Sequence, residues 1–457
     1  MGKTRKKKNH RKGWLVGSNA TQIICVSFVL VIALGTLLLT LPIASRSGRL
    51  GVVDAMFTAT SATCVTGLVV RDTWTQFTMF GQVVILLLIQ VGGLGFMTIA
   101  CLFFFALRRR IGLRQRMVLA QALGSDTYSG IVSLVRNILR GTAAVEGVGA
   151  LILFFRFLPE FGFGRALWYG VFHSVSAFCN AGFDVLADVD VGGSLCRYAT
   201  DPVVNFTIMA LIVIGGLGFA VWGDIRHHRR FSRLSVYSRL VVIITTVLIF
   251  GGAGVFAALE WNNPNTIGDL TVPQKLMAAL FQSVTLRTAG FATFDQNALS
   301  DVSKAASDLL MLVGGSSGST AGGVKTATVG VILLSAWSTA RGRTSVHVMK
   351  RRIPRQAVEN ASALFILVLL LSGLGAAFLS IADHVSLENA LYETISALCT
   401  VGLTTGITSS LGTASQIILI VLMFFGRLGI MTISVGFMAA NRAEERVSYA
   451  ETKIMIG

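Results

Sequence analysis

A short phrase ending in a glycine and an apolar residue occurs four times in this chain, at intervals of about 110 residues. Its copies are SATCVTGL, SAFCNAGF, VTLRTAGF and SALCTVGL, aligned on Gly67, Gly182, Gly290 and Gly402. The residue three positions before each glycine is Cys64, Cys179, Arg287 or Cys399, and the residue six positions before it is Ser61, Ser176, Val284 or Ser396. Four matching phrases in one polypeptide predict four equivalent backbone positions around a common feature.

The composition places these phrases in a membrane protein. Of the 457 residues, 53% are hydrophobic and only 13% are charged, and the mean hydropathy is +0.71, which is too apolar for an ordinary soluble domain. A helix needs about 20 apolar residues to cross the hydrocarbon. Eight stretches qualify: 21–41, 77–107, 131–157, 203–222, 238–259, 305–340, 357–381 and 414–440. Four shorter apolar segments precede the phrases and are predicted to be re-entrant: 53–63, 166–178, 273–285 and 387–398.

The distribution of charge predicts the topology. The net charge of +17 comes from basic clusters that all fall on one side of the membrane when each long stretch is counted as one crossing. These clusters are 3–12, 108–116, 226–239, 341–355 and the region of Arg442 and Arg446. The positive-inside rule then places both termini in the cytoplasm, and nucleic acid is not the expected partner. Several acidic residues fall mostly on the outer side: Asp54, Asp184, Asp188, Asp190, Asp269, Asp295 and Glu388. They either concentrate cations there or simply solvate the outer loops.

The remaining signals exclude other classes. Residues 23–41 are too long for a signal-peptide core and lack a cleavage site before Pro42, so we expect them to form a first span. The six cysteines are scattered without a CxxC pair, which predicts neither a disulfide framework nor a zinc site.

Three of the later spans also share a motif, GGLGFMT at 92–98, GGLGFAV at 215–221 and GRLGIMT at 426–432. In its place the third repeat has VGGSSGSTAGGVKT at 313–326, and irregular backbone at that depth must be buried in protein or line water.

The phrases suit the coordination of a cation by backbone. A short helix that enters the bilayer and returns leaves peptide groups that need partners, and four such returns around one axis can replace the water shell of a monovalent cation with carbonyl oxygens. Glycine permits the φ > 0 conformations that such backbone requires, and helix C-termini favour a cation. The alternative is that these glycines only allow close helix packing. Their common register, each behind a short segment and ahead of a full span, favours the cation site.

With these phrases, the chain resembles the superfamily of potassium transporters that includes the Trk, Ktr and plant HKT proteins. NAGF at 180–183, RTAGF at 287–291, TVGL at 400–403 and the third-repeat loop carry the resemblance, which covers the chain from about residue 20 onward. It implies an all-α polytopic fold with four pseudo-fourfold M1–P–M2 repeats around one pore, at 21–107, 131–222, 238–340 and 357–440, between a basic N-terminus (1–20) and a cytoplasmic tail (441–457). Eight spans make it most like the Ktr membrane subunit.

The resemblance also implies a selectivity filter and favours potassium over sodium, because all four glycines are retained. The filter residues would be Cys64, Val65, Thr66, Gly67, Cys179, Asn180, Ala181, Gly182, Arg287, Thr288, Ala289, Gly290, Cys399, Thr400, Val401 and Gly402. A thiolate metal site on the three cysteines is disfavoured, because Arg287 at the fourth position would repel a metal. Arg287 is expected behind the filter, holding carbonyls or an acid in place, with a solvated rim position as the alternative.

The loop of the third repeat is expected to form a gate. It nearly spells a phosphate-binding loop, but Val324 breaks the GxxxxGK[ST] spacing. By resemblance it obstructs the pore below the filter and moves on activation, and its small polar residues suit a mobile segment that needs little packing. The gate residues would be Gly314, Gly315, Ser316, Ser317, Gly318, Ser319, Thr320, Ala321, Gly322, Gly323, Lys325 and Arg427. Lys325 and Arg427 are costly charges at membrane depth. Glu146 is either their acidic partner or a buried structural residue.

These observations predict potassium uptake across a bacterial plasma membrane, with K⁺ as the transported ion, no other cofactor and no enzymatic activity. By resemblance, the chain forms a homodimer on a cytoplasmic ring of nucleotide-binding, RCK-type regulatory subunits, and the lipid bilayer surrounds it. Alternatives are a sodium-selective relative and a sodium-coupled carrier with a midplane site at broken helices. A membrane enzyme that uses the near-miss phosphate loop is a third.

Overall fold

The structure is a computed structural model that describes residues 20–95, 131–186, 193–343 and 345–429, and this part of the chain is mostly helical. Its strands are the short hairpin β1 (His347–Val348) and β2 (Arg351–Arg352). The basic N-terminus before Ala20, the predicted tail 441–457, and Asp188 and Asp190 lie outside the described residues. So do the basic clusters at 108–116 and at Arg442 and Arg446.

Four of the described helices are long and apolar enough to cross a membrane: α1 (Ala20–Leu39), α7 (Ile131–Phe178), α10 (Val236–Glu260) and α14 (Arg355–Asp383). A fifth crossing results if α8 (Pro202–Gly216) and α9 (Phe219–His228), which meet at 94°, are counted together. Helices α4 (Met79–Leu94), α12 (Asp301–Met311), α13 (Thr326–Ala340) and α16 (Thr413–Leu428) are shorter. The count of eight crossings therefore stays a prediction.

The motif shared by three repeats, GGLG at 92–95 and 215–218 and GRLG at 426–429, which we call the GGLG motif, explains where α4, α8 and α16 end. Its last glycine has a left-handed φ in each copy, +81° at Gly95, +88° at Gly218 and +84° at Gly429. A helix cannot continue through such a residue, so α4, α8 and α16 all end at the motif. The predicted span over 203–222 is therefore broken at Gly218, and whether its two parts form one crossing stays a prediction. The rest of 77–107 and of 414–440 extends beyond the described residues.

Four short helical stretches match the predicted re-entrant segments. Three are α2 (Val52–Cys64), α11 (Val272–Thr285) and α15 (Leu387–Leu398), and the fourth is the last part of α7, which follows a break at Gly162 with φ of +71°. Local capping fixes where they begin. Thr271 and Gln274 form a capping box at α11, and the Ser386 hydroxyl accepts a hydrogen bond from the first turn of α15.

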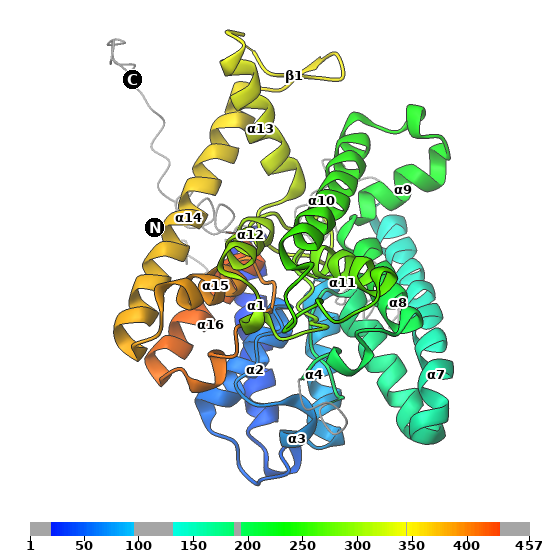
Figure 1. Ribbon diagram of the computed structural model, residues 1–457, viewed down its shortest axis with the longest axis vertical. Helices are drawn as coiled ribbons and strands as arrows, with labels where there is room; N and C mark the ends of the chain where they lie inside the picture. Colours follow the sequence, from blue (N-terminus) through cyan, green and yellow to red (C-terminus); the bar gives the residue numbers. More distant parts are fainter. Residues whose placement is uncertain (1–19, 96–130, 187–192, 344, 430–457) are drawn as a thin grey trace, which may run out of the picture.

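The helices pack in a cyclic order. Helix α4 packs against α7, α8 against α11, α12 against α15, and α16 against α2, so the last described helix returns to the first short one. Figure 1 shows α15 and α16 on one side of the molecule and α7, α8, α10 and α11 on the other, with blue α2 and α4 between them in the lower half. The loops that follow the short helices therefore meet in the middle.

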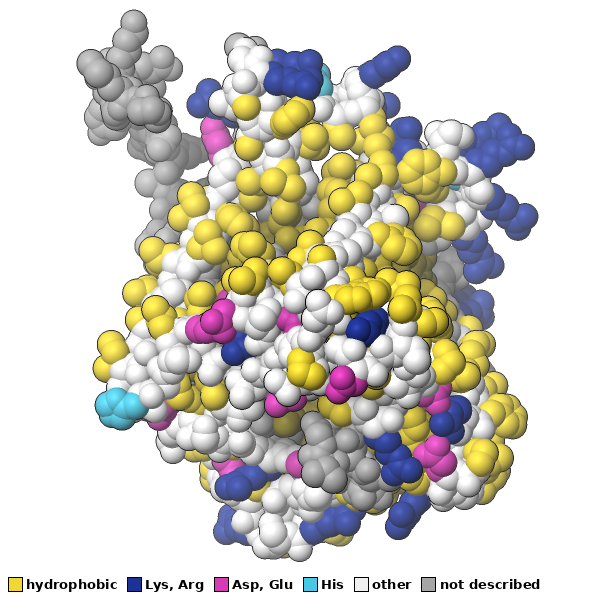
Figure 2. Space-filling view, in the orientation of Figure 1, with side chains coloured by type: hydrophobic (Ala, Val, Ile, Leu, Met, Phe, Trp, Pro, Cys, Tyr) yellow, Lys and Arg dark blue, Asp and Glu magenta, His cyan; other side chains and the backbone are white. Residues whose placement is uncertain are grey.

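The surface is divided into two polar ends and an apolar flank. Figure 2 shows hydrophobic side chains spread over the flanks, where α10, α13 and α14 expose Val247, Phe250, Leu333 and Leu370 among others. Lysine and arginine side chains gather at the end that carries β1 and α9 (Figure 2). The opposite end also has basic residues, and one of them, Arg71, pairs with Asp54 at 3.0 Å. This division is what a membrane-embedded protein requires.

Candidate functional site

The four phrase glycines lie together in a closed ring. A Cβ added to Gly67 would lie 2.5 Å from the carbonyl oxygen of Ala181, the residue before Gly182. A Cβ added to Gly182 would lie 2.8 Å from the carbonyl oxygen of Ala289 in the third phrase, and one added to Gly290 would lie 2.6 Å from that of Val401 in the fourth. Gly402 completes the ring, because its nearest neighbour is the carbonyl oxygen of Thr66 in the first phrase. Each glycine thus borders the backbone of the next phrase, and a side chain has no room.

The four backbones also share an unusual conformation. The ring glycines have φ values of +99°, +68°, +80° and +92° in chain order. The residue two positions before each glycine is left-handed as well, although none of these is glycine: Val65 (+57°), Asn180 (+59°), Thr288 (+67°) and Thr400 (+51°). Left-handed backbone costs an ordinary residue about 1–2 kcal/mol. Four repeats of this cost at equivalent positions make the phrases candidates for functional backbone.

Hydroxyl groups at the ends of the short helices fix this conformation. The Ser61 and Ser396 hydroxyls accept hydrogen bonds from the amides of Gly67 and Gly402, at 3.1 and 3.0 Å. In the second phrase the Ser176 hydroxyl instead donates to the Phe183 carbonyl at 2.7 Å. The third phrase has valine at this position, and the next residue, Thr285, donates to the Phe291 carbonyl at 2.6 Å. Each phrase therefore has a hydroxyl anchor, and Thr285 is one that the sequence alignment does not reveal.

The first glycine of each GGLG motif lies against the end of a short helix. The nearest neighbours of Cβ atoms added to Gly92, Gly215 and Gly426 are the carbonyl oxygens of residues four positions before a ring glycine, in the first, second and fourth phrases. These oxygens belong to Thr63, Phe178 and Leu398. All three contacts are closer than a real Cβ permits. The motif therefore serves two purposes, close packing at its first glycine and helix termination at its last.

Residues 313–326, which we call the gate segment, connect α12 to α13 and are firmly held. Within the segment, Gly314 N donates to Val324 O at 2.9 Å and Thr326 Oγ1 donates to Gly314 O at 2.9 Å. It is also anchored to the break between α8 and α9, where Ser316 N donates to Gly216 O at 3.0 Å. Most of its residues are buried. The expectation that this segment needs little packing is wrong, because its small residues allow close backbone contact instead.

The gate segment lies directly against two of the four phrases. The Thr320 hydroxyl donates to Phe178 O, at the end of the second short helix, at 3.0 Å. Gly322 borders Thr400 and the Cys399 carbonyl of the fourth phrase, and a Cβ at Gly322 would overlap the Thr400 hydroxyl. The segment therefore borders the phrases on the side where the short helices end.

The two predicted gate cations bind backbone oxygens. The Arg427 guanidinium donates to Thr320 O of the gate segment at 2.5 Å, and to Gly92 O and Gly93 O at the end of α4 at 2.5 and 3.1 Å. Lys325 Nζ donates to Ala321 O at 2.8 Å within the segment. Glu146 forms no ion pair with Arg427 or Lys325 in the described structure. Its carboxylate accepts a hydrogen bond from Gln90 Nε2, at 3.2 Å. Arg427 thus connects α16, α4 and the gate segment.

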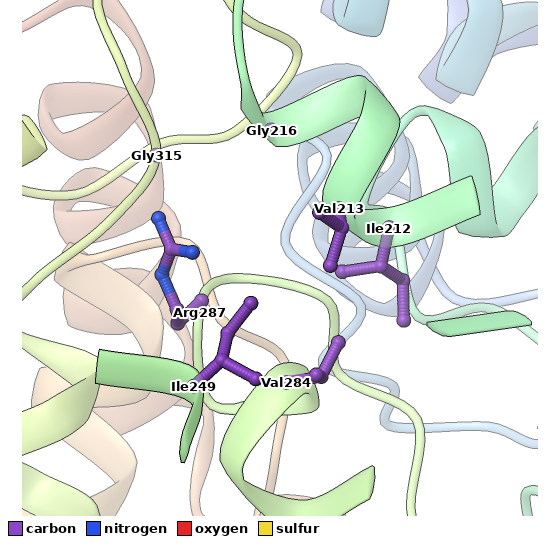
Figure 3. A pocket seen from close by; sticks show the side chains of 7 residues that line it. All are labelled: Ile212, Val213, Gly216, Ile249, Val284, Arg287 and Gly315. Atoms are coloured by element: carbon purple, nitrogen blue, oxygen red, sulfur yellow. The ribbon is translucent and has the colours of Figure 1, made fainter. Parts of the chain in front are cut away.

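Arg287, in the third phrase, is buried with 7% of its surface exposed, so the alternative of a solvated rim position is wrong. Figure 3 shows its side chain pointing toward Gly216 and Gly315, into a cavity of about 10 Å³ lined otherwise by apolar side chains. Its Nη2 lies 3.3 Å from the Thr245 hydroxyl. Among the described residues its Nε has no partner and it forms no ion pair. The expected contacts with an acid or a carbonyl are therefore not among its hydrogen bonds.

The cysteines behave as small buried side chains. Cys64, Cys179 and Cys399 are buried free thiols. In the part of the chain that the structure describes, no group of three or more His, Cys, Asp or Glu residues is arranged to hold a metal ion. What the four phrases bring together is backbone oxygen, which suits a hard monovalent cation better than a transition metal.

Comparison with known proteins assigns the family. The sequence profile of the TrkH family, described as "Cation transport protein", matches residues 3–446. The chain belongs to the TrkH family. The TrkH-family fold is also that of a solved relative: the crystal structure of the potassium transporter TrkH from Vibrio parahaemolyticus superimposes with a TM-score of 0.73 at 17% sequence identity. That match covers 93% of this chain and 86% of the other.

Curated relatives of this TrkH-family chain match it over nearly its whole length. It is 40% identical to the Ktr system potassium uptake protein B of Bacillus subtilis, over 95% of this chain and 96% of the relative. It is 39% identical to the potassium/sodium uptake protein NtpJ of Enterococcus hirae, over 95% of this chain and 97% of the relative. The predicted resemblance to the Ktr and Trk proteins is confirmed.

Proposed function

We propose that this chain is the ion-translocating subunit of a bacterial potassium-uptake system in the plasma membrane. The observation that carries the proposal is the closed ring in which each phrase glycine borders the carbonyl of the next phrase. Backbone oxygens arranged around one axis can stand in for the water shell of potassium. The names of its relatives as potassium uptake proteins support the same ion.

The ring implies four M1–P–M2 units, each with a short helix that ends at its phrase. The units are 21–107, 131–222, 238–340 and 357–440, and the cyclic order of helix packing supports them. The filter consists of the sixteen residues 64–67, 179–182, 287–290 and 399–402. The C-terminal ends of the short helices direct partial negative charge toward the ring, which favours a cation.

The gate segment closes this pathway. It lies against the second and fourth phrases and is fastened by Arg427 to the end of α4. A cation leaving the filter would meet both this backbone and a buried positive charge. Opening requires that the contacts of Arg427 and Thr320 break together. We propose that a homodimer of this chain on a cytoplasmic, nucleotide-binding ring of RCK type supplies the energy for that step.

A second candidate is uptake of sodium alone or coupled to potassium. It is favoured by one observation, the 39% identity to a protein named as a potassium/sodium uptake protein. By resemblance to the family, retention of glycine at all four ring positions favours potassium as the main ion.

The test is growth and uptake in a bacterium that lacks its own potassium transporters. Expression of the chain with its regulatory partner should restore growth at low potassium, and excess sodium should compete weakly. An experimental structure in rubidium should show ion density inside the glycine ring. Growth that depends on sodium rather than potassium would favour the second candidate. Ion density elsewhere, with none in the ring, would refute the proposed filter.

A further inference from the structure

A buried carboxylate lies behind the second phrase. Glu146 is on α7 and only 9% of it is exposed. Both of its carboxylate oxygens are 3.2 Å from Nε2 of Gln90 on α4. Its own backbone oxygen accepts a hydrogen bond of 2.7 Å from the Ser174 hydroxyl, which fixes the two parts of α7 against each other at this point. No ion pair to Glu146 occurs among the described residues.

The side chains of Gln90 and Glu146 also contact the second phrase from outside the glycine ring. Cys179 Sγ, in the second phrase, lies 3.5 Å from Gln90 Oε1 and 3.9 Å from Glu146 Oε1. The end of α4 packs on this thiol as well, since a Cβ at Gly93 would lie 2.6 Å from the Cys179 sulfur. Cys179, Gln90 and Glu146 thus form one polar contact between two helices and a phrase, which we call the Glu146 bridge.

The Glu146 bridge also reaches the gate. Gln90 comes two and three residues before Gly92 and Gly93, whose carbonyls bind Arg427. These residues belong to the last turn of α4, so a shift of Gln90 moves the carbonyls that hold the guanidinium. The other donor group of Arg427 binds the gate segment at Thr320. One helical turn therefore links the carboxylate to the gate without a direct contact.

We propose that Glu146 is a positioning residue that sets the placement of both the second phrase and the Arg427 contacts, and so controls ion selectivity and closed-state leak together. The inference rests on the filter and gate assigned under the proposed function. A carboxylate at membrane depth is costly and marks a functional position by default. Here Glu146 contacts Cys179 of the proposed filter and Gln90, which lies two and three residues before the carbonyls that bind Arg427 of the proposed gate.

The chain offers a matched control in Glu260, a carboxylate on α10 that is 1% exposed. Glu260 accepts hydrogen bonds from Ser300 and Thr266 at 2.7 and 2.8 Å, and these partners lie in loops beyond the end of α10. It is as buried as Glu146 but touches neither a phrase nor α4 in its hydrogen bonds. Loss of its charge should affect stability alone.

The experiment compares Glu146→Gln, Glu146→Leu, Gln90→Leu and Glu260→Gln in the full-length chain, purified and reconstituted into liposomes without the regulatory partner. Potassium and sodium fluxes give the selectivity and the leak, and thermal unfolding gives the stability. Glu146→Leu and Gln90→Leu should lower the potassium-to-sodium ratio and raise the leak by about two- to tenfold, the range that one lost hydrogen bond supports. Glu146→Gln, which keeps the shape and polar atoms, should retain more of both properties.

The double variant Glu146→Leu/Gln90→Leu should be no worse than the more severe single variant, because both remove one contact. Glu260→Gln should lower thermal stability without changing the ratio. Equal selectivity and leak in all variants, or equal effects of Glu146→Leu and Glu260→Gln, would overturn the inference. Gly290→Ala is included as a filter variant. If Gly290→Ala also leaves selectivity unchanged, the proposed function itself fails; if only Gly290→Ala changes it, the Glu146 bridge alone is refuted.

Discussion

The glycine ring can be tested by adding one methyl group at Gly290. A Cβ there would lie 2.6 Å from the carbonyl oxygen of Val401, and 3.1 and 3.3 Å from the Cα atoms of Gly182 and Gly402. These neighbours are backbone, so they cannot swing aside. Real Cβ atoms essentially never come within 3.0 Å of a neighbour, so Gly290→Ala must move the Val401 oxygen by at least 0.4 Å, the difference between 3.0 and 2.6 Å.

Gly406, four residues beyond the ring glycine of the fourth phrase, provides the control. Its φ of +90° is close to the +80° of Gly290, but nothing lies within 4 Å of its added Cβ. In both alanine variants the left-handed backbone therefore lowers the free energy of unfolding by about 1–2 kcal/mol. Only Gly290→Ala adds the strain of overpacking, about 1–3 kcal/mol. We expect destabilisation of about 2–5 kcal/mol for Gly290→Ala and about 1–2 kcal/mol for Gly406→Ala.

The assay pairs thermal unfolding in detergent with potassium uptake in competition with sodium. If displacement of one ring oxygen weakens potassium binding by about 1.4 kcal/mol, the potassium-to-sodium ratio falls about tenfold. Gly406→Ala should keep the wild-type ratio. Equal stability and equal selectivity of the two variants would refute the argument that the four phrases form a sterically closed filter.

Three further outcomes follow from the contacts of the site. Arg427→Gln should raise potassium leak in liposomes without altering selectivity, because it frees the gate segment but leaves the ring in place; a leak no larger than that of the wild type would contradict the gate. Ser396→Ala removes a hydrogen bond to a ring amide and should lower the potassium-to-sodium ratio by about two- to tenfold, whereas the same change at exposed Ser410 should not. Gly92→Ala should destabilise the protein by at least about 1–3 kcal/mol, while Gly147→Ala, in an open helical position, should stabilise it by about 0.5–1 kcal/mol in unfolding measurements.

The short helices and the meeting of the four phrases could be predicted because they are repeated. A repeated spacing of Gly67, Gly182, Gly290 and Gly402 behind four short apolar segments leaves few other arrangements. The helix limits of α2, α11 and α15 agree with the predicted segments to within about one residue. The assignment of these residues to a filter and a gate stays a prediction, supported by the ring geometry and the family.

The remaining features depend on contacts between distant segments, which one sequence does not reveal. The sequence places the GGLG motif within the later spans, and it does not reveal that the left-handed φ of Gly218 breaks the helix there. The composition of the gate segment suggested looseness, whereas its glycines permit tight backbone pairing. Arg287 was expected to hold an acid or a carbonyl, and it meets the Thr245 hydroxyl beside a small cavity instead. Glu146 is a candidate ion-pair partner by sequence, and in the structure it contacts Gln90, two residues before the Gly92 carbonyl that binds Arg427.

The ring is built by one polypeptide rather than by identical subunits, and this has an evolutionary consequence. In a symmetric tetramer every substitution is imposed on all quadrants at once. Here a single codon changes one quadrant only. That freedom explains how an arginine can stand where the other quadrants have cysteine, and how the third repeat alone can carry the segment 313–326, while all four ring glycines keep a positive φ.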